Sequence, residues 1–295
     1  MTPDSLRLVP LRTLYIDGPE VGFELHPGDR ALVTAEQRVD AGADLAAHIR
    51  EAHTAVVAGP APTEEAAQPG RHWTPPPGRR SHEDEGEPGG ELLFRSGDRW
   101  RIGTGAHDEP VEAPVGGTIG SVKPGVEIRL RTAARGILGA ETLGNPTSGH
   151  LAIVTGPDGE VRAPHIDVSA SGSILVVGAR IDAEALTRAR AVGVRGVIVA
   201  ALGVKERRDF LASERRGRAA VHGLPPFGIL VLDGAAGRPI ASPVMDGLRA
   251  MEGRTAAILA DPACVVVEDA DLELPRPPAD LVRVRSGPLV GAAGR

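Results

Sequence analysis

Residues 171–268 constrain the fold most, because continuous apolar runs alternate there with segments of helical spacing. Such short, uninterrupted runs are typical of strands that are covered on both faces. The runs are 173–178, 195–200, 227–232 and 255–259, and the helical segments are about 182–193, 204–222 and 242–253. Strands that alternate with helices predict an α/β domain with a mainly parallel sheet and right-handed crossovers. A further run, 264–267, is interpreted as an antiparallel edge strand.

The first and third helical segments carry start and stop signals. Asp182 is an N-cap candidate for the first helix, and Gly193 is the residue type that ends helices. Ser242 and Pro243 supply the cap and the first-turn proline of the third helix, which Gly253 ends.

The rest of the chain has the pattern of short strands. Apolar stretches of a few residues in 7–49 and 91–170 are separated by Gly, Pro and Asp, and the whole chain contains 38 glycines and 26 prolines. This pattern is typical of small barrels and sandwiches. We therefore assign 1–58 and 91–170 to one β domain.

Residues 59–90 have a different composition, rich in proline, glycine and acidic residues, with Trp73 as the one large apolar side chain. Such a segment buries too little apolar surface to offset its chain entropy, so we predict a disordered insertion. The Trp73–Pro77 stretch is either part of an inert linker or a polyproline docking motif.

Two glycines are spaced around Val33 and Val39, and the stretch Val111–Ile119 contains an Ala-Pro pair followed by paired glycines. These two stretches resemble the two half-motifs of biotinyl/lipoyl-type barrel-sandwich hybrid domains. In particular, they are similar to the barrel-sandwich domain of the soluble C subunit of Rnf-type electron-transport complexes. The resemblance implies that the two stretches form one barrel. Carrier domains of this kind also have a modifiable lysine between characteristic neighbours on a hairpin; Lys123 lies in a suitable turn but lacks those neighbours.

The last 16 residues, 280–295, resemble the KOW motif of NusG-type transcription factors and ribosomal proteins, with Gly287, Gly291 and Gly294 at its turn glycines. The resemblance implies contact with RNA, the ribosome or polymerase. A full KOW barrel is longer, so either the chain is a fragment or the segment forms only an edge hairpin. Residues 269–279 are interpreted as a stiff linker. The expected fold is therefore mixed: an N-terminal all-β barrel-sandwich hybrid, an α/β domain, and a C-terminal SH3/KOW-like hairpin.

Composition excludes several classes of protein. Aromatic residues make up 2%, which argues against stacking platforms for single-stranded nucleic acid, and a net charge of −6 argues against a protein that coats nucleic acid. Cys264 is the one cysteine, so cysteine-held metal clusters and internal disulfides are excluded. Charges interrupt residues 1–16, and no apolar run reaches the ~18–20 residues of a membrane span. We expect a cytoplasmic protein without direct membrane insertion, and no cofactor.

Two carboxylates are metal-site candidates. Asp233 and Asp261 each follow an apolar run that is predicted to be a parallel strand, and ligands of open α/β sheets bind at the carboxyl ends of such strands. Two carboxylates there could hold Mg²⁺. Both residues also belong to ordinary turn dipeptides. His150 and His165 could join a metal site only by long-range convergence.

The helical segment near 205–218 is the candidate surface for RNA or an acidic partner, because arginine suits phosphate recognition. Its alternative is a solvated face crossed by ion pairs such as Lys205–Asp209. The candidate binding residues are Arg207, Arg208, Arg215, Arg216 and Arg218.

The sequence favours a non-catalytic binding or scaffold protein that presents its barrel, α/β and KOW-like surfaces to a macromolecular partner such as RNA, the ribosome or the transcription machinery. One alternative is a small-ligand or Mg²⁺-dependent enzyme at the carboxyl edge of the α/β sheet. The other is a diverged accessory of an Rnf-like electron-transport complex.

Overall fold

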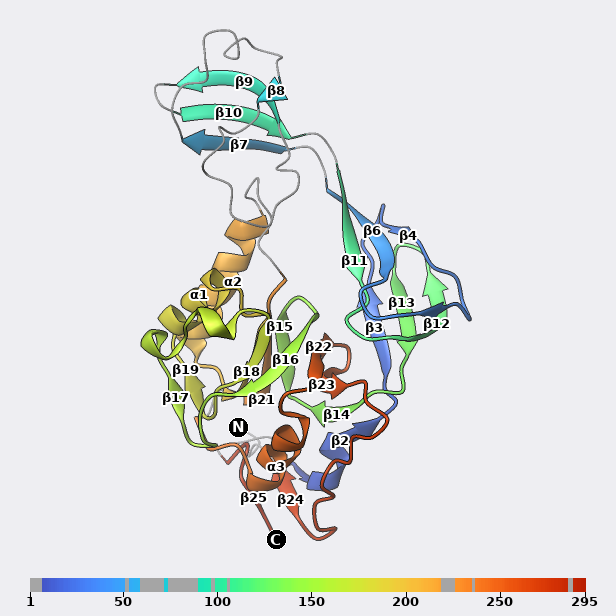
Figure 1. Cartoon of the computed structure of the whole chain (residues 1–295), viewed down its shortest axis with the longest axis vertical. Helices are drawn as coiled ribbons and strands as arrows, with labels where there is room; N and C mark the ends of the chain where they lie inside the picture. The colour runs from blue at the N-terminus through green and yellow to red at the C-terminus, as the bar shows by residue number, and fades with distance from the viewer. Residues whose placement is uncertain are drawn as a thin grey trace, which may run out of the picture.

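The computed structural model describes residues 7–50, 53–58, 72–73, 90–96, 99–104, 107–218, 226–234, 237–285 and 289–295 (Figure 1). Side chains are described for 7–48, 108–214, 226–234, 237–285 and 289–295. The 59–90 segment, predicted to be a disordered insertion, lies outside the described residues except for a two-residue strand and its final glycine. The described chain is a mixed α/β fold that consists mostly of strands.

The largest element is a nine-stranded sheet. In spatial order its strands are β15 (Glu141–Gly144), β21 (Gly228–Gly234), β20 (Gly196–Ala201), β18 (Ser173–Val176), β16 (Thr147–Ile153), β22 (Thr255–Ala260), β23 (Ala263–Val267), β14 (Arg135–Leu138) and β2 (Tyr15–Asp17). The four strands from β21 to β16 run parallel to one another, and every other neighbouring pair is antiparallel. The sheet is therefore mixed rather than mainly parallel.

Two strand predictions need correction. The run 255–259 forms β22, which follows a helix but runs antiparallel to β16. The run 264–267 forms β23, which is antiparallel as expected but is not an edge strand, because β14 pairs with its outer side. The edge beyond β14 is formed by β2. The predicted apolar runs end at β23, and β14 and β2, which come from earlier in the chain, thus extend the sheet beyond it.

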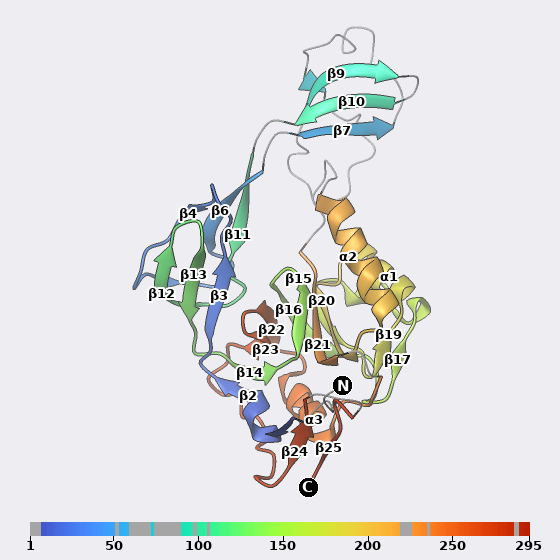
Figure 2. The same ribbon diagram turned by 180° about the vertical axis from the view of Figure 1, so that it is seen from behind.

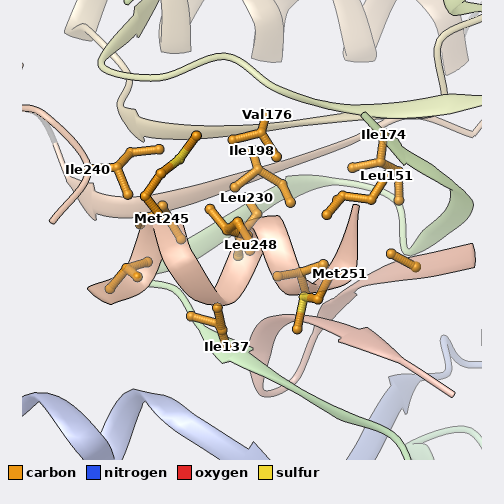
Figure 3. Close-up of a cluster of buried hydrophobic side chains, with 14 of the residues drawn as sticks. Ile137, Leu151, Ile174, Val176, Ile198, Leu230, Ile240, Met245, Leu248 and Met251 are labelled. Atoms are coloured by element: carbon orange, nitrogen blue, oxygen red, sulfur yellow. The ribbon is translucent and has the colours of Figure 1, made fainter. Parts of the chain in front are cut away.

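The parallel strands are covered on both faces by helices, which are α1 (Ala183–Ala191), α2 (Val204–Arg218) and α3 (Ser242–Met251). Side chains alternate between the faces of a strand. Ile174 and Val176 in β18 point into the core that α3 covers, whereas Leu175 and Val177 point into the core beneath α1 and α2. Figure 3 shows Leu248 of α3 among the side chains of the first core. Burial on both faces explains why these strands are uninterrupted apolar runs.

The helix boundaries follow the predicted signals closely. The Asp182 carboxylate accepts a 2.6 Å hydrogen bond from the Ala185 N–H and caps α1, which confirms the prediction. Gly193 has a φ of 87°, a left-handed conformation that glycine adopts without steric cost. At the start of α3 the prediction is one residue off, because Ala241 occupies the N-cap position, where it offers no side-chain cap, and Ser242 is already inside the helix.

Two smaller sheets form a β module beside the large one (Figure 2). Their strands are β3 (Glu20–Glu24), β13 (Glu127–Arg131), β12 (Gly117–Lys123) and β5 (Arg38–Val39) in one sheet, and β11 (His107–Glu112), β6 (Asp44–Arg50) and β4 (Arg30–Ala31) in the other. Val33 and Val115 are buried in one shared core, so the two distant stretches do fold against each other. Cys264 and Val266 of β23 belong to the same core. The β module therefore packs directly on the nine-stranded sheet.

A separate four-stranded sheet is inserted between β6 and β11. Its strands, in spatial order, are β7 (His53–Ala58), β10 (Arg99–Thr104), β9 (Gly90–Ser96) and β8 (His72–Trp73). The chain leaves the β module at the end of β6 and returns at the start of β11, where Arg50 and His107 are opposite each other in an antiparallel pair. We call this element the inserted sheet.

The two ends of the described chain meet in a three-stranded sheet made of β1 (Leu8–Pro10), β24 (Val282–Val284) and β25 (Ala293–Gly294). The segment 280–295 therefore forms a hairpin whose first strand pairs with the N-terminal strand. The remaining elements are a two-stranded sheet of β17 (Glu160–Val161) and β19 (Arg180–Ile181), and the 3-10 turns η1 (Leu11–Leu14), η2 (Ala163–His165) and η3 (Val168–Ala170). None of the helices in the described part of the chain has the length and apolar character that crossing a bilayer demands.

Candidate functional site

Asp233, the first candidate metal ligand, is buried and forms an ion pair. It lies near the end of β21, and its carboxylate faces the guanidinium of Arg283 from the terminal hairpin. The two side chains are 1% and 0% exposed. Burial, and secondarily the charge of Arg285, lowers the pKa of Arg283 to about 10, so the guanidinium is still charged at neutral pH. Asp233 thus has an internal cation as its partner.

The terminal hairpin covers this end of the sheet. Gly291 has a φ of 87°, and a Cβ added there would lie 2.9 Å from the carboxyl carbon of Asp233. The hairpin glycine therefore lets the backbone approach the ion pair closely. Beside it, an open pocket of about 380 Å³ lies between the start of α3 and the hairpin, lined by Ile240, Pro243 and Ala292 among others.

Asp261, the second candidate, lies at the opposite end of the sheet along the strand direction. It follows β22, which runs antiparallel to the strands that end beside Asp233. Its side chain is 60% exposed and lies 3.0 Å from Nη1 of Arg129. One strand length, about 20 Å, separates the two ends of the strands in such a sheet. The structure therefore does not bring Asp233 and Asp261 together, and they cannot share one ion.

The basic helix α2 is partly engaged inside the protein. Arg207 forms an ion pair with Glu141 of β15, and Arg208 lies 3.3 Å from the carboxylate of Asp209. Glu214 is buried and pairs with Arg190 of α1. The side chains of Arg215, Arg216 and Arg218 lie outside the described residues. Arg207 and Glu214 thus pair with other elements, whereas Arg208 pairs within α2 and its side chain is 74% exposed.

The histidines that the sequence singled out do not converge. His150 lies on β16. His165 ends the short turn η2, where its Nδ1 accepts a 3.3 Å hydrogen bond from the Arg162 N–H. Asp167 caps the next turn through Ser169. Lys123 lies at the end of β12 and pairs with Glu127 at 2.5 Å, and its hydrogen bond lowers the pKa of that carboxyl.

A different cluster of potential ligands forms in the β module, from residues that sequence reasoning missed. His26, Asp29 and His48 each offer one ligand atom, and these atoms all lie within 4.8 Å of one another. Asp29 Oδ1 lies 2.7 Å from His48 Nδ1, and Asp29 Oδ2 lies 3.8 Å from His26 Nδ1. The two imidazole rings meet edge to face, with centroids 5.1 Å apart and an interplanar angle of 77°.

Local structure positions these three side chains. Gly28 has a φ of 99° and closes a tight turn, in which the Asp29 N–H donates to the His26 carbonyl at 3.0 Å. The His26 N–H donates in return to Asp29 Oδ2 at 2.7 Å. His48 lies on β6, between β4 and β11. The sequence Pro27-Gly28-Asp29 is typical of a turn, but no local pattern indicates that β6 lies beside it.

Comparisons with protein-family models, with curated proteins and with solved structures find no match to this chain.

Proposed function

We propose that the protein is a non-catalytic binding protein that presents the inserted sheet to a macromolecular partner. The observation that carries this proposal is the inserted sheet itself, a four-stranded element placed in the β6–β11 hairpin of the β module. The hairpin is anchored, since Leu45 and Ala46 of β6 are fully buried in the module core. A hairpin with such a base is suited to hold a binding element in a defined position.

The aromatic residues favour this element as the contact surface. The chain has two tryptophans and an aromatic content of 2%. Both tryptophans belong to the inserted sheet: Trp73 lies in β8 opposite Gly90, and Trp100 lies in β10 opposite Arg95. Tryptophan and arginine are enriched at protein–protein interfaces and carry much of their binding energy. A chain that is otherwise poor in aromatic residues has thus concentrated its largest ones in one element.

We propose that the β module is a barrel-sandwich hybrid, which is supported by the shared core of Val33 and Val115. We also propose that the KOW-like segment serves chiefly to close the fold. Its support is that Arg283 faces Asp233, that Arg285 donates to the Gly139 carbonyl, and that Arg295 pairs with Asp280. Because these arginines have internal partners, we favour a protein partner at the inserted sheet over RNA bound by the terminal segment.

A shortened chain tests the proposal. Arg50 and His107 are register partners, so an Asn-Gly turn in place of residues 51–106 closes the β6–β11 hairpin with a favoured two-residue loop. We expect this variant to unfold at the same temperature as the full chain. Affinity purification from cells, with and without ribonuclease, then compares the two proteins.

The proposal predicts that the full chain enriches a protein partner that the shortened chain does not retain, and that ribonuclease leaves this partner bound. Equal recovery on both chains would locate the binding surface elsewhere. Recovery that ribonuclease abolishes would identify RNA as the ligand and contradict the preference for protein. Specific enrichment of neither would refute the binding function.

A further inference from the structure

We propose that His26, Asp29 and His48 form a binding site for a divalent transition-metal ion of the Zn²⁺ class. The inference is independent of the proposed partner-binding function. It depends on the convergence of two imidazoles and one carboxylate, with ligand atoms that all lie within 4.8 Å of one another.

The donor set selects the class of ion. Imidazole suits Zn²⁺ and the neighbouring transition metals, whereas Mg²⁺ and Ca²⁺ prefer sites made of oxygen ligands. Two histidines and one carboxylate are a known donor set for Zn²⁺, and they leave a fourth position for water or another ligand. The site is therefore expected to discriminate against Mg²⁺ and Ca²⁺.

Small movements complete the coordination geometry. A tetrahedral ion with ligand distances of about 2.0–2.1 Å has its ligand atoms about 3.3 Å apart. Asp29 Oδ1 and His48 Nδ1, at 2.7 Å, must therefore separate slightly to bind one ion. His26 Nδ1, which lies 3.8 Å from the other carboxylate oxygen, must turn toward the same ion. The side chain of His26 is 62% exposed and can rotate without disturbing the core.

The other two ligands are already held in place. The Asp29 side chain is 3% exposed and accepts the backbone N–H of His26, so its carboxylate has a defined orientation. His48 is 21% exposed on a strand with a neighbour on each side, and Glu109 lies directly across from it on β11. Ligands whose rotamers are fixed by surrounding structure bind with a smaller entropic cost. Arg30, the nearest arginine in sequence, is paired with Asp108 at 2.9 Å.

The competing explanation is a simple hydrogen bond, in which His48 Nδ1–H donates to Asp29 and no ion is involved. The two explanations differ in the role of His26. A hydrogen bond between His48 and Asp29 does not need the His26 imidazole, whereas an ion bound by all three residues does.

The experiment titrates the metal-free full chain with Co²⁺, whose visible absorption reports histidine coordination, and with Zn²⁺ by calorimetry. The test variant is His26→Gln, because this exposed side chain can be changed without a loss of core packing. Asp29→Asn is the second variant, and His150→Gln, at an exposed histidine outside the cluster, is the matched control. Circular dichroism verifies that every variant is folded.

We expect one equivalent of ion to bind the wild type and His150→Gln equally. His26→Gln and Asp29→Asn should each weaken binding by at least about tenfold, on the scale seen when metal-site residues are lost. Mg²⁺ and Ca²⁺ should not compete. The absence of saturable Co²⁺ and Zn²⁺ binding would overturn the proposal, and so would binding that His26→Gln leaves unchanged.

Discussion

The Asp233–Arg283 ion pair supplies the sharpest prediction about stability. Both side chains are almost completely buried, and they join β21 of the large sheet to β24 of the terminal hairpin. Arg283→Met leaves the Asp233 carboxylate buried without its cation. Breaking a buried pair in this way costs about 3–5 kcal/mol. Asp233→Leu leaves the opposite charge uncompensated and should cost a similar amount.

The double variant Arg283→Met/Asp233→Leu removes both charges and should recover most of the loss. Buried pairs that are replaced by apolar side chains of similar size are often neutral or stabilising. We therefore expect the double variant to lie within about 1 kcal/mol of the wild type, or to be more stable than it.

Urea unfolding followed by far-ultraviolet circular dichroism measures these free energies. Hydrogen exchange of the Val284 N–H, which donates to the Ala292 carbonyl at 2.9 Å, reports whether the hairpin detaches first. A single variant that loses less than about 1 kcal/mol and keeps its Val284 protection would refute the assigned role of the pair. A double variant no more stable than either single variant would also contradict it.

Three further predictions concern individual residues. The one tyrosine, Tyr15, donates to the Pro243 carbonyl at 2.5 Å, and burial, with Asp246 second, raises its pKa to about 12. Absorbance titration should therefore show no phenolate near pH 10, where an exposed tyrosine ionises, and stability should fall as pH rises from 10 toward 12 because the unfolded chain ionises first. Burial likewise raises the pKa of the Cys264 thiol to about 12, so a thiol reagent at pH 8 should modify the chain only after unfolding; rapid labelling of folded protein would contradict its placement. A Cβ at Gly136 would lie 1.9 Å from the Val265 carbonyl oxygen, so Gly136→Ala should cost about 3 kcal/mol. Gly294→Ala, which meets nothing within 4 Å, should cost little, and equal effects of the two changes in urea unfolding would argue against the close pairing of β14 and β23.

Local patterns in the sequence predicted the elements of the α/β region, and the direction of every strand except β22. The apolar runs and the Asp182 cap are local signals, and each corresponds to an observed element. The direction of β22 is not a local property, because a strand buried on both faces has the same apolar pattern whether its neighbours run parallel or antiparallel. That unpredicted reversal is what separates Asp261 from Asp233.

The candidate sites show the same division between local and long-range information. Asp233 and Asp261 belong to turn-like dipeptides in the sequence, but the partner that neutralises Asp233 is Arg283, 50 residues away along the chain. His26 and His48 come together only through the placement of β6 beside the turn that contains Asp29. The register between two strands depends on the connecting turns and on how both faces are packed. Residue spacing within one stretch of sequence does not specify either of these.

The central proposal is that the inserted sheet is the surface that contacts a partner, and photo-crosslinking in cells tests it most directly. A photoreactive amino acid replaces Arg99, in β10 of the inserted sheet, or Val126, a 56% exposed residue in the β12–β13 turn of the β module. We predict a discrete crosslinked protein from position 99 and none from position 126. Crosslinks from position 126 alone, or from neither position, would contradict the proposal.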